Sequence, residues 1–424
     1  MQPRKGKKKD IDKEEEEEEE VSGEEEEEEQ NFDKKPDMLD KYLAAAKISQ
    51  EAMKFVINLC VPNALIAEVC IKGDKKIEEE LSKIYNNKKK KTEKGIAFPV
   101  CVSPNEFCGH YAPMPEESLL LKIGDVVKID LGCHIDGYIA KISHTFVIGA
   151  SPTNKVTGKK AEVVLAARKA FEAILRYVKE NNLNNDCTKI IKHVADTYKC
   201  KPVEGVLSHR VKKHIIDCNE TILNCETHDQ KVKDHKFEKH EVYVIDIVMS
   251  SGEGKPKDSE LRSTIFKRAY ENTYLLKLKG AQKFFHIVNQ KYPTLPFSIS
   301  GFEDLTSAKI GVKECCQHEL FHEYPVLKEK ENEIVAQFKA TLAIMKHGSM
   351  VLNYFPFDEN CYESNIKIIN PDLLKLLESS IEYKKPAKVK PAKVEEVKKD
   401  QKKEEQEDKK EVNPIVEDKK EEKK

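Results

Sequence analysis

The sequence predicts an α+β fold with an inserted helical subdomain and disordered charged tails. Segments with helical spacing of apolar residues alternate along the chain with short β-rich runs bounded by Gly, Pro and Asn. A further helical pattern stands between the last two β-rich runs, which places it as an insertion. Both ends of the chain are too polar to contribute to a core.

The two tails are defined by their charge runs. Residues 1–36 contain RKGKKK followed by EEEEEEE and EEEEEE, and residues 384–424 mix Lys and Glu with few large apolar side chains. Such segments bury too little apolar surface to offset the entropy of ordering, so we expect both tails to be disordered and residues 37–383 to form the folded domain. RKGKKK also matches a nuclear localisation signal, a match that short basic runs often make by chance.

Periodicity places the elements of the folded part. Apolar residues at helical spacing predict an amphipathic helix over 38–60 and a second helix to about Ile84, the first through Leu39, Leu43, Ala46, Met53 and Ile57. Further helices are expected at 158–180 and 188–198, and strands at 95–103, 125–132, 138–149, 241–252 and 333–345. A helical pattern at about 267–290 lies within residues 253–332, which we expect to be the inserted subdomain.

Composition excludes several classes of protein. The formal net charge is −2, so net charge does not indicate a nucleic-acid ligand and any basic surface must be local. The 12 cysteines show no CxxC spacing and no secretory signal precedes them, which favours reduced thiols in the cytosol or nucleus. The longest apolar stretch, 55–71, is interrupted by polar residues and falls short of the roughly 18 that a membrane span needs.

Three residues that can bind metals or form hydrogen bonds lie in or beside the β-rich runs. They are Asp130, His209 and Asp246, each flanked by apolar residues. Taken singly, such an Asp more often caps a turn and such a His more often belongs to the core. Their order along the chain is therefore more informative than any one of them.

That order resembles the methionine aminopeptidases, whose pita-bread fold binds two divalent metals through Asp, Asp, His, Glu and Glu. Asp130 in KIDLG matches the first Asp, and Lys141 in GYIAKIS stands at the second. His209 in LSH matches the His. Asp246 in VYVIDIV replaces the first Glu, and Lys339 in AQFKAT stands at the second. The resemblance therefore implies a vestigial metal site with lysine at two of its five positions.

The lysines change the chemistry expected of this site. A protonated ammonium has no lone pair to donate to a metal, and two ammonium groups with two carboxylates sum to about zero charge without any metal. We therefore expect no metal cofactor and no hydrolysis by metal-activated water. His110 in GHYAP matches a substrate-side histidine of those enzymes, but Ile216 and Asp217 stand where its partner histidine is expected.

Several long motifs resemble more specifically the proliferation-associated proteins, the ErbB-receptor-binding protein family. They include KGIAFPVCVS, LKIGDVVKIDLGCHIDGYIA, EGVLSHRVKKHIIDCNETI and EVYVIDIVMSSGEGKPKD, in order over roughly 38–380. The resemblance implies a non-catalytic relative of type II methionine aminopeptidase. It also implies association with the large ribosomal subunit near the nascent-chain exit, binding of rRNA or other structured RNA, nuclear protein partners, and roles in translation, ribosome assembly and growth in cytoplasm, nucleus and nucleolus.

Two basic segments adjoin the folded part. One comprises Lys88, Lys89, Lys90 and Lys91; the other, within 384–393, comprises Lys384, Lys385, Lys388, Lys390 and Lys393. Lysine runs are usually solvated faces, yet cations beside a folded surface also suit phosphate-backbone binding. Since both segments lack arginine and aromatic interleaving, we expect recognition of backbone and shape rather than of bases.

Two other functions are compatible with the sequence. An active aminopeptidase would use a mononuclear site of Asp130, His209 and Asp246, and the two lysines inside the metal cage argue against it. A transcription cofactor would use its tails to bind chromatin proteins. Sequencing the RNA recovered with the protein from nuclear and cytosolic extracts separates that role from a ribosomal one.

Overall fold

Two helices open the folded part of the computed structural model, which describes residues 30–87 and 91–381. They are α1 (Pro36–Leu59) and α2 (Ile66–Ser82), close to the predicted bounds. Of the predicted apolar stripe of α1, Ala46 and Met53 are fully buried, whereas Leu43 is 37% exposed. The buried face also carries Tyr42, Ala45, Ser49 and Ala52. Small residues let the helix approach the sheet closely, and the Ser49 hydroxyl donates to the Ala140 carbonyl at 3.0 Å.

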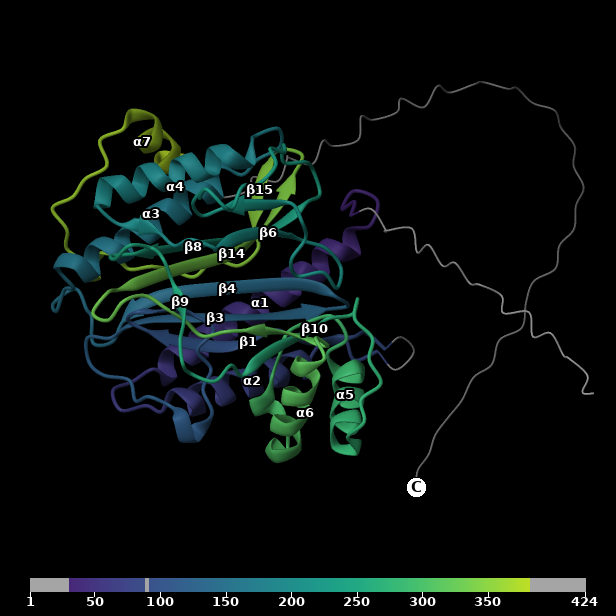
Figure 1. Ribbon diagram of the computed structural model, residues 1–424. Helices are drawn as coiled ribbons and strands as arrows, with labels where there is room; N and C mark the ends of the chain where they lie inside the picture. Colours follow the sequence, from purple (N-terminus) through teal and green to yellow (C-terminus); the bar gives the residue numbers. More distant parts are fainter. Residues whose placement is uncertain (1–29, 88–90, 382–424) are drawn as a thin grey trace, which may run out of the picture. The chain divides into compact units, whose positions relative to one another are not determined.

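The core of the fold is a nine-stranded sheet in the order β1-β3-β4-β14-β8-β6-β7, with β15 beside β14 and β5 beside β8 (Figure 1). Its strands are β1 (Lys94–Pro104), β3 (Val126–Ile135), β4 (Tyr138–Val147), β5 (Lys201–Pro202), β6 (Leu207–Val211), β7 (Thr221–Leu223), β8 (Val242–Ser250), β14 (Val335–Met345) and β15 (Gly348–Val351). All these pairs are antiparallel. β14, late in the chain, therefore lies between the two halves of the sheet.

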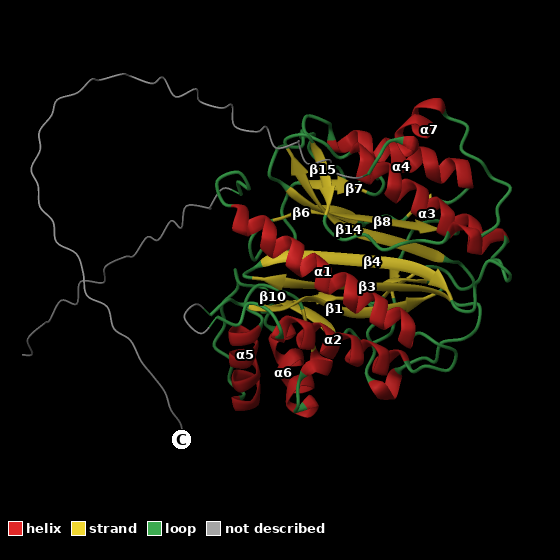
Figure 2. Ribbon diagram, turned by 180° about the vertical axis from the view of Figure 1, so that it is seen from behind, coloured by secondary structure: helices red, strands yellow, loops and turns green. Residues whose placement is uncertain are grey.

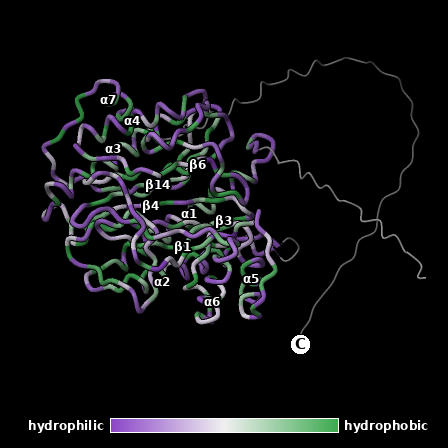
Figure 3. The backbone as a smooth tube through the Cα atoms, viewed as in Figure 1, coloured by the Kyte–Doolittle hydropathy of each residue, from purple (hydrophilic) through white to green (hydrophobic). Residues whose placement is uncertain are grey.

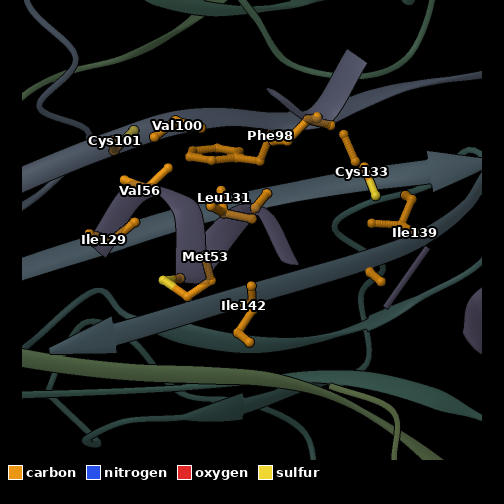
Figure 4. Close-up of a cluster of buried hydrophobic side chains, with 14 of the residues drawn as sticks. Met53, Val56, Phe98, Val100, Cys101, Ile129, Leu131, Cys133, Ile139 and Ile142 are labelled. Carbon is orange, nitrogen blue, oxygen red and sulfur yellow. The ribbon is translucent and has the colours of Figure 1, made fainter. Parts of the chain in front are cut away.

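The pleat of β3 gives the sheet one apolar face and one polar face. Successive side chains of a strand point to opposite faces. Ile129, Leu131 and Cys133 lie with Val56 of α1 in one buried cluster (Figure 4). Asp130, between them in sequence, points to the opposite face. Helices α1 and α2 thus cover one side of the β1-β3-β4 half.

The other half of the sheet is covered in the same way. Helices α3 (Gly158–Tyr177) and α4 (Asn184–Tyr198) belong to a second cluster with Ile245, Ile247, Phe338 and Ala340 of β8 and β14. Figure 2 shows α1 along β3 and β4, and α3 along β8 and β14. A short helix, α7 (Pro371–Glu378), packs on α3. These helices leave the opposite face of the strands to polar residues.

The segment between β8 and β14 holds two helices and several short strands. These are β9 (Lys257–Asp258), β10 (Ile265–Arg268), α5 (Lys279–Lys291), β11 (Phe297–Ser298), α6 (Leu305–Gln317), β12 (Phe321–Tyr324) and β13 (Leu327–Lys328). β13 also pairs with β2 (Phe107–Gly109). The prediction of one helix over 267–290 was wrong at its start: 265–268 is a strand, and Leu275 in the following loop is 86% exposed.

Hydropathy follows the layers of the fold. Figure 3 shows hydrophobic stretches along the central strands and hydrophilic ones along outer loops. Within residues 30–87 and 91–381, no helix is long and apolar enough to cross a membrane.

His144 on β4 is a buried titratable group within the core. Its ring is 5% exposed and lies among Phe338, Phe355 and Phe357, with centroid distances of 5.5, 4.8 and 6.2 Å. Burial, and then the positive charge of Arg168, lowers the pKa of His144 to about 3. Its Nδ1 is buried without a hydrogen-bond partner among the described residues.

We predict that His144→Phe makes folding stability less sensitive to acid. The pKa of His144 is depressed in the folded state, so the wild type loses stability as pH falls from about 6.5 toward 3, because only the unfolded chain takes up the proton. The variant lacks this effect, so its loss of unfolding free energy between pH 7 and pH 4 should be smaller by roughly 3 kcal/mol. Urea titrations measure this. His228→Phe, at a side chain 99% exposed, is the control, and equal pH dependence in all three proteins would refute the account.

Candidate functional site

Strand register aligns the predicted site residues on the helix-free face of the sheet. Asp130 pairs with Ser143, Ser143 with Lys339, and Lys339 with Asp246, across four adjacent strands. Directly paired residues in an antiparallel sheet point to the same face. Asp130, Lys339 and Asp246, far apart in sequence, therefore form one row.

The ammonium group of Lys339 lies between the two carboxylates. Its Nζ is 2.5 Å from Asp130 Oδ2 and 3.1 Å from Asp246 Oδ2. Lys339 is only 4% exposed. Burial alone would lower its pKa, but the charges of Asp130 and Asp246 and their hydrogen bonds raise the pKa of Lys339 above its ordinary value. Lys339 is thus a protonated, buried cation at neutral pH.

Neighbouring polar groups hold the second carboxylate in place. Gln337, two residues before Lys339 on β14, donates from Nε2 to Asp246 Oδ1 at 2.8 Å. The hydroxyl of Ser143 donates to Gln337 Oε1 at 3.2 Å, and the Asp246 amide donates to Ser208 Oγ at 2.9 Å. Sequence analysis missed Gln337, although the period of two along a strand places it on the same face as Lys339.

Lys141 lies on the same face but makes no ion pair with any residue of 30–87 or 91–381. Its partner across the strand is Gly132, and its Nζ stands 4.0 Å from the centroid of the Phe98 ring. Thr341 and Asn353 bond its backbone, at 2.9 Å to the amide and 3.0 Å to the carbonyl. Burial, and then the positive charge of Lys339, lowers the pKa of Lys141 to about 8. The two lysines of the site therefore differ in their electrostatic surroundings.

Two imidazoles line the same space. His209 Nδ1 is 3.3 Å from the Cys218 carbonyl, and His110 Nδ1 is 3.0 Å from the Pro325 carbonyl. Because a carbonyl only accepts, Nδ1 carries the proton in both rings and Nε2 is left as an acceptor. Burial first, and the charge of Lys141 in addition, lowers the pKa of both imidazoles, so both are neutral at neutral pH.

These groups line one cavity of about 700 Å³. Its walls include all six predicted positions: Asp130, Lys141, His209, Asp246, Lys339 and His110. Ile216 and Asp217, found where a partner histidine was expected, also line it. Phe98 and Tyr324, which sequence analysis did not single out, stack edge to face at 5.6 Å on one side.

With this geometry established, comparison with known proteins identifies the family. The model of metallopeptidase family M24 matches residues 40–273. The chain belongs to metallopeptidase family M24. Within it, the chain is 43% identical to ERBB-3 binding protein 1 of Solanum tuberosum, over 74% of this chain and 80% of that one. It is 39% identical to proliferation-associated protein A of Dictyostelium discoideum, over 84% and 92%.

A solved structure agrees with this assignment. The chain superimposes on a thermophilic Arx1 with a TM-score of 0.77 at 31% identity, over 82% of this chain and 99% of that one. The fold is thus the pita-bread fold of M24 proteins, as the sequence predicted, and the resemblance to the proliferation-associated and ErbB-receptor-binding proteins is confirmed.

The residues of this M24 site do not fit the two divalent metals of an aminopeptidase. The Lys339 ammonium stands within hydrogen-bonding distance of both remaining carboxylates, and a protonated lysine cannot coordinate a metal. Among residues 30–87 and 91–381, no group of three or more His, Cys, Asp or Glu side chains is arranged to hold a metal ion. No catalytic step through a metal can be derived from this arrangement.

The basic segments proposed from the sequence fall largely outside the described residues. Lys88, Lys89 and Lys90 lie outside them, as do the five tail lysines Lys384, Lys385, Lys388, Lys390 and Lys393. Lys91 is described and exposed. The structure adds a basic surface that sequence analysis missed, on α5. The signal was present, because residues 272–302 contain four lysines and no Asp or Glu.

We predict that Lys339→Met destabilises the fold by about 3–5 kcal/mol, because Asp130 and Asp246 then lose their buried cation. Chemical denaturation at pH 7 measures the change in unfolding free energy. Lys141→Met is the matched control, since Lys141 makes no ion pair in the described part of the chain and its replacement leaves no carboxylate unpaired. Equal stability of Lys339→Met and the wild type would mean that the ion pairs do not hold the site together.

Proposed function

We propose that this protein is a non-catalytic M24 protein that binds ribosomes or structured RNA and acts in translation, ribosome assembly and growth control in cytoplasm and nucleus. The loss of catalysis is carried by one observation, the Lys339 ammonium between Asp130 and Asp246. Binding of a divalent ion there requires loss of a proton whose pKa the two carboxylates hold high. The site is therefore neutralised by a side chain in place of metal.

We predict that the purified protein holds no stoichiometric divalent metal and releases no methionine from Met-starting peptides. Elemental analysis after dialysis and a peptide assay supplemented in turn with Mn²⁺, Co²⁺, Fe²⁺ and Zn²⁺ measure the two properties. A metal content near two equivalents together with peptide turnover would overturn the proposal. Lys339→Glu, assayed in parallel, shows whether removing this one cation is enough to admit a metal.

The surface of α5 supports binding to a phosphate backbone. Lys279, Lys283 and His286 recur at helical spacing on its exposed side, and Lys291 is exposed at its end. None of these lysines forms an ion pair with a carboxylate in the part of the chain that the structure describes. Unpaired cations on a rigid helix suit a polyanion, since their charge is not already balanced.

The lysines of α2 differ in this respect. Lys72 pairs with Glu68 at 2.8 Å, and Lys76 and Lys83 pair with Glu80 at 2.6 and 2.7 Å. Their charge is largely balanced within the helix surface. The acid-free character of α5 therefore separates it from an ordinary solvated lysine face.

A groove joins α5 to the predicted basic loop. A cavity of about 520 Å³ is lined by Lys91 before β1, by Lys94 at the start of β1 and by Lys291 at the end of α5. Glu78 and Glu93 also line it, so the groove is mixed in charge at its floor. We propose that Lys88–Lys91 and α5 act together on one phosphate backbone, because phosphate contacts fix register only when the cations share one surface.

We predict that ribosome binding weakens with salt and depends on these lysines. Alanine at Lys88, Lys89, Lys90 and Lys91 should lower the slope of log affinity against log salt by up to about 4 if all four contact phosphate. Lys279→Ala with Lys283→Ala should lower it by up to about 2. Co-sedimentation with ribosomes over a salt series measures the slope.

Two controls test where the binding lysines lie and whether negative charge opposes binding. Lys192→Ala with Lys201→Ala removes two exposed lysines from the α4 and β5 region and should leave the slope unchanged. Removing residues 1–29 deletes the acidic runs, so binding should be equal or tighter. An unchanged slope in both basic variants, or loss of binding on deleting the acidic segment, would place the interface elsewhere.

A further inference from the structure

The cavity that includes the vestigial site is lined by both apolar and polar side chains. Phe98, Val206, Val244, Val248, Tyr324 and Leu327 contribute apolar surface. The row of Asp130, Lys339 and Asp246 lines the same cavity. A volume of about 700 Å³ falls within the roughly 300–1,000 Å³ of small-molecule sites. Loss of the metal site has therefore not filled the space.

Most carboxylates along this cavity contact a lysine. Asp130 and Asp246 share Lys339, Asp217 has Lys267 at 2.6 Å, and Glu204 has Lys255 at 3.8 Å. Lys141 has no carboxylate within ion-pair distance in the described part of the chain. Its ammonium rests on the Phe98 ring, without the direct carboxylate contact that Lys339 and Lys255 have among the described residues.

The hydrogen-bonding capacity of the two imidazoles is also unused on the cavity side. Nδ1 of His209 and of His110 is engaged by a backbone carbonyl. The Nε2 atoms therefore offer acceptor sites to a ligand that carries an N–H or O–H group. The two Nε2 atoms and the Nζ of Lys141 are not among the buried, unpartnered polar atoms of the described residues. All three atoms are therefore accessible from the cavity.

We propose that this cavity binds a small carboxylic acid of the acylated amino-acid type. The carboxylate pairs with the Lys141 ammonium, the amide N–H donates to an imidazole Nε2 of His209 or His110, and an apolar side group lies against Phe98 and Tyr324. A monoanion fits better than a phosphate dianion, because a single lysine without a direct carboxylate contact in the described part of the chain stands beside several carboxylates that would repel a second negative charge. This binding site is separate from the cationic surface proposed above for RNA and does not depend on it.

Saturation-transfer NMR and calorimetry with N-acetyl-L-leucine test the proposal, with N-acetyl-L-leucinamide as the matched ligand without a carboxylate. The full-length protein should bind the acid, and the amide at least tenfold more weakly. N-acetyl-Gly-Gly-Leu distinguishes the source of the carboxylate: equal or tighter binding points to the C-terminus of a chain, and weaker binding points to a free acid. Equal binding of acid and amide, or no binding of the acid at millimolar concentration, would overturn the proposal.

Variants of Lys141 test whether its ammonium binds the carboxylate of the ligand. Lys141→Met should weaken binding of the acid at least tenfold without changing binding of the amide, and Lys141→Arg, which keeps the charge, should retain most of the affinity. Lys213→Met, at a lysine 43% exposed that pairs with Asp136 outside this cavity, should bind as the wild type does. Thermal unfolding confirms that each variant is folded. Unchanged affinity in Lys141→Met, or displacement of the acid by equimolar inorganic phosphate, would refute a carboxylate site at Lys141.

Discussion

Burial of the Lys339 ammonium between two carboxylates depends on the register of four strands, and the packing of both helix pairs enforces that register. Asp130, Ser143, Lys339 and Asp246 face one another only in the observed pairing. A slip of one residue in β14 would turn Lys339 into the apolar layer under α3 and bring a neighbouring apolar side chain into the polar row. Apolar packing on one face and ion pairing on the other therefore specify the same alignment.

This ion-paired row is stable only because its charges and hydrogen bonds are matched. Removing two carboxylates and an ammonium from water is costly, and attraction alone compensates only when remaining polar groups also find partners. Gln337 and the backbone amide of Asp246 supply such partners, through the Gln337–Asp246 and Asp246–Ser208 hydrogen bonds. Asp130 Oδ1 is the exception, buried without a partner among the described residues. The hydrogen-bonding groups of the row therefore find more partners at Asp246 on β8 than at Asp130 on β3.

Much of the fold could be predicted from the sequence, whereas side-chain partnerships could not. The short β-rich runs bounded by Gly, Pro and Asn located β3, β4, β8 and β14 within a few residues, since that pattern is local. The helix expected from 267 failed because a helical spacing of apolar residues also fits a strand followed by a loop with exposed Leu275. The Lys339–Asp130 contact joins residues 209 positions apart and follows from register, which composition and motif do not fix.

The same limit applies to the two lysines, which the motif alignment treated as equivalent replacements of metal charge. Lys339 faces carboxylates on both sides, whereas Lys141 faces Gly132 and a phenyl ring. Only Lys339 therefore takes over the structural role of a metal. Burial, and then the charge of Lys339, lowers the pKa of Lys141, an energetic cost that an apolar side chain at this position would avoid. The Lys141 ammonium, which has no direct carboxylate contact among the described residues and lies in an open cavity with two neutral imidazoles, is the feature of this site that structural stability alone does not explain.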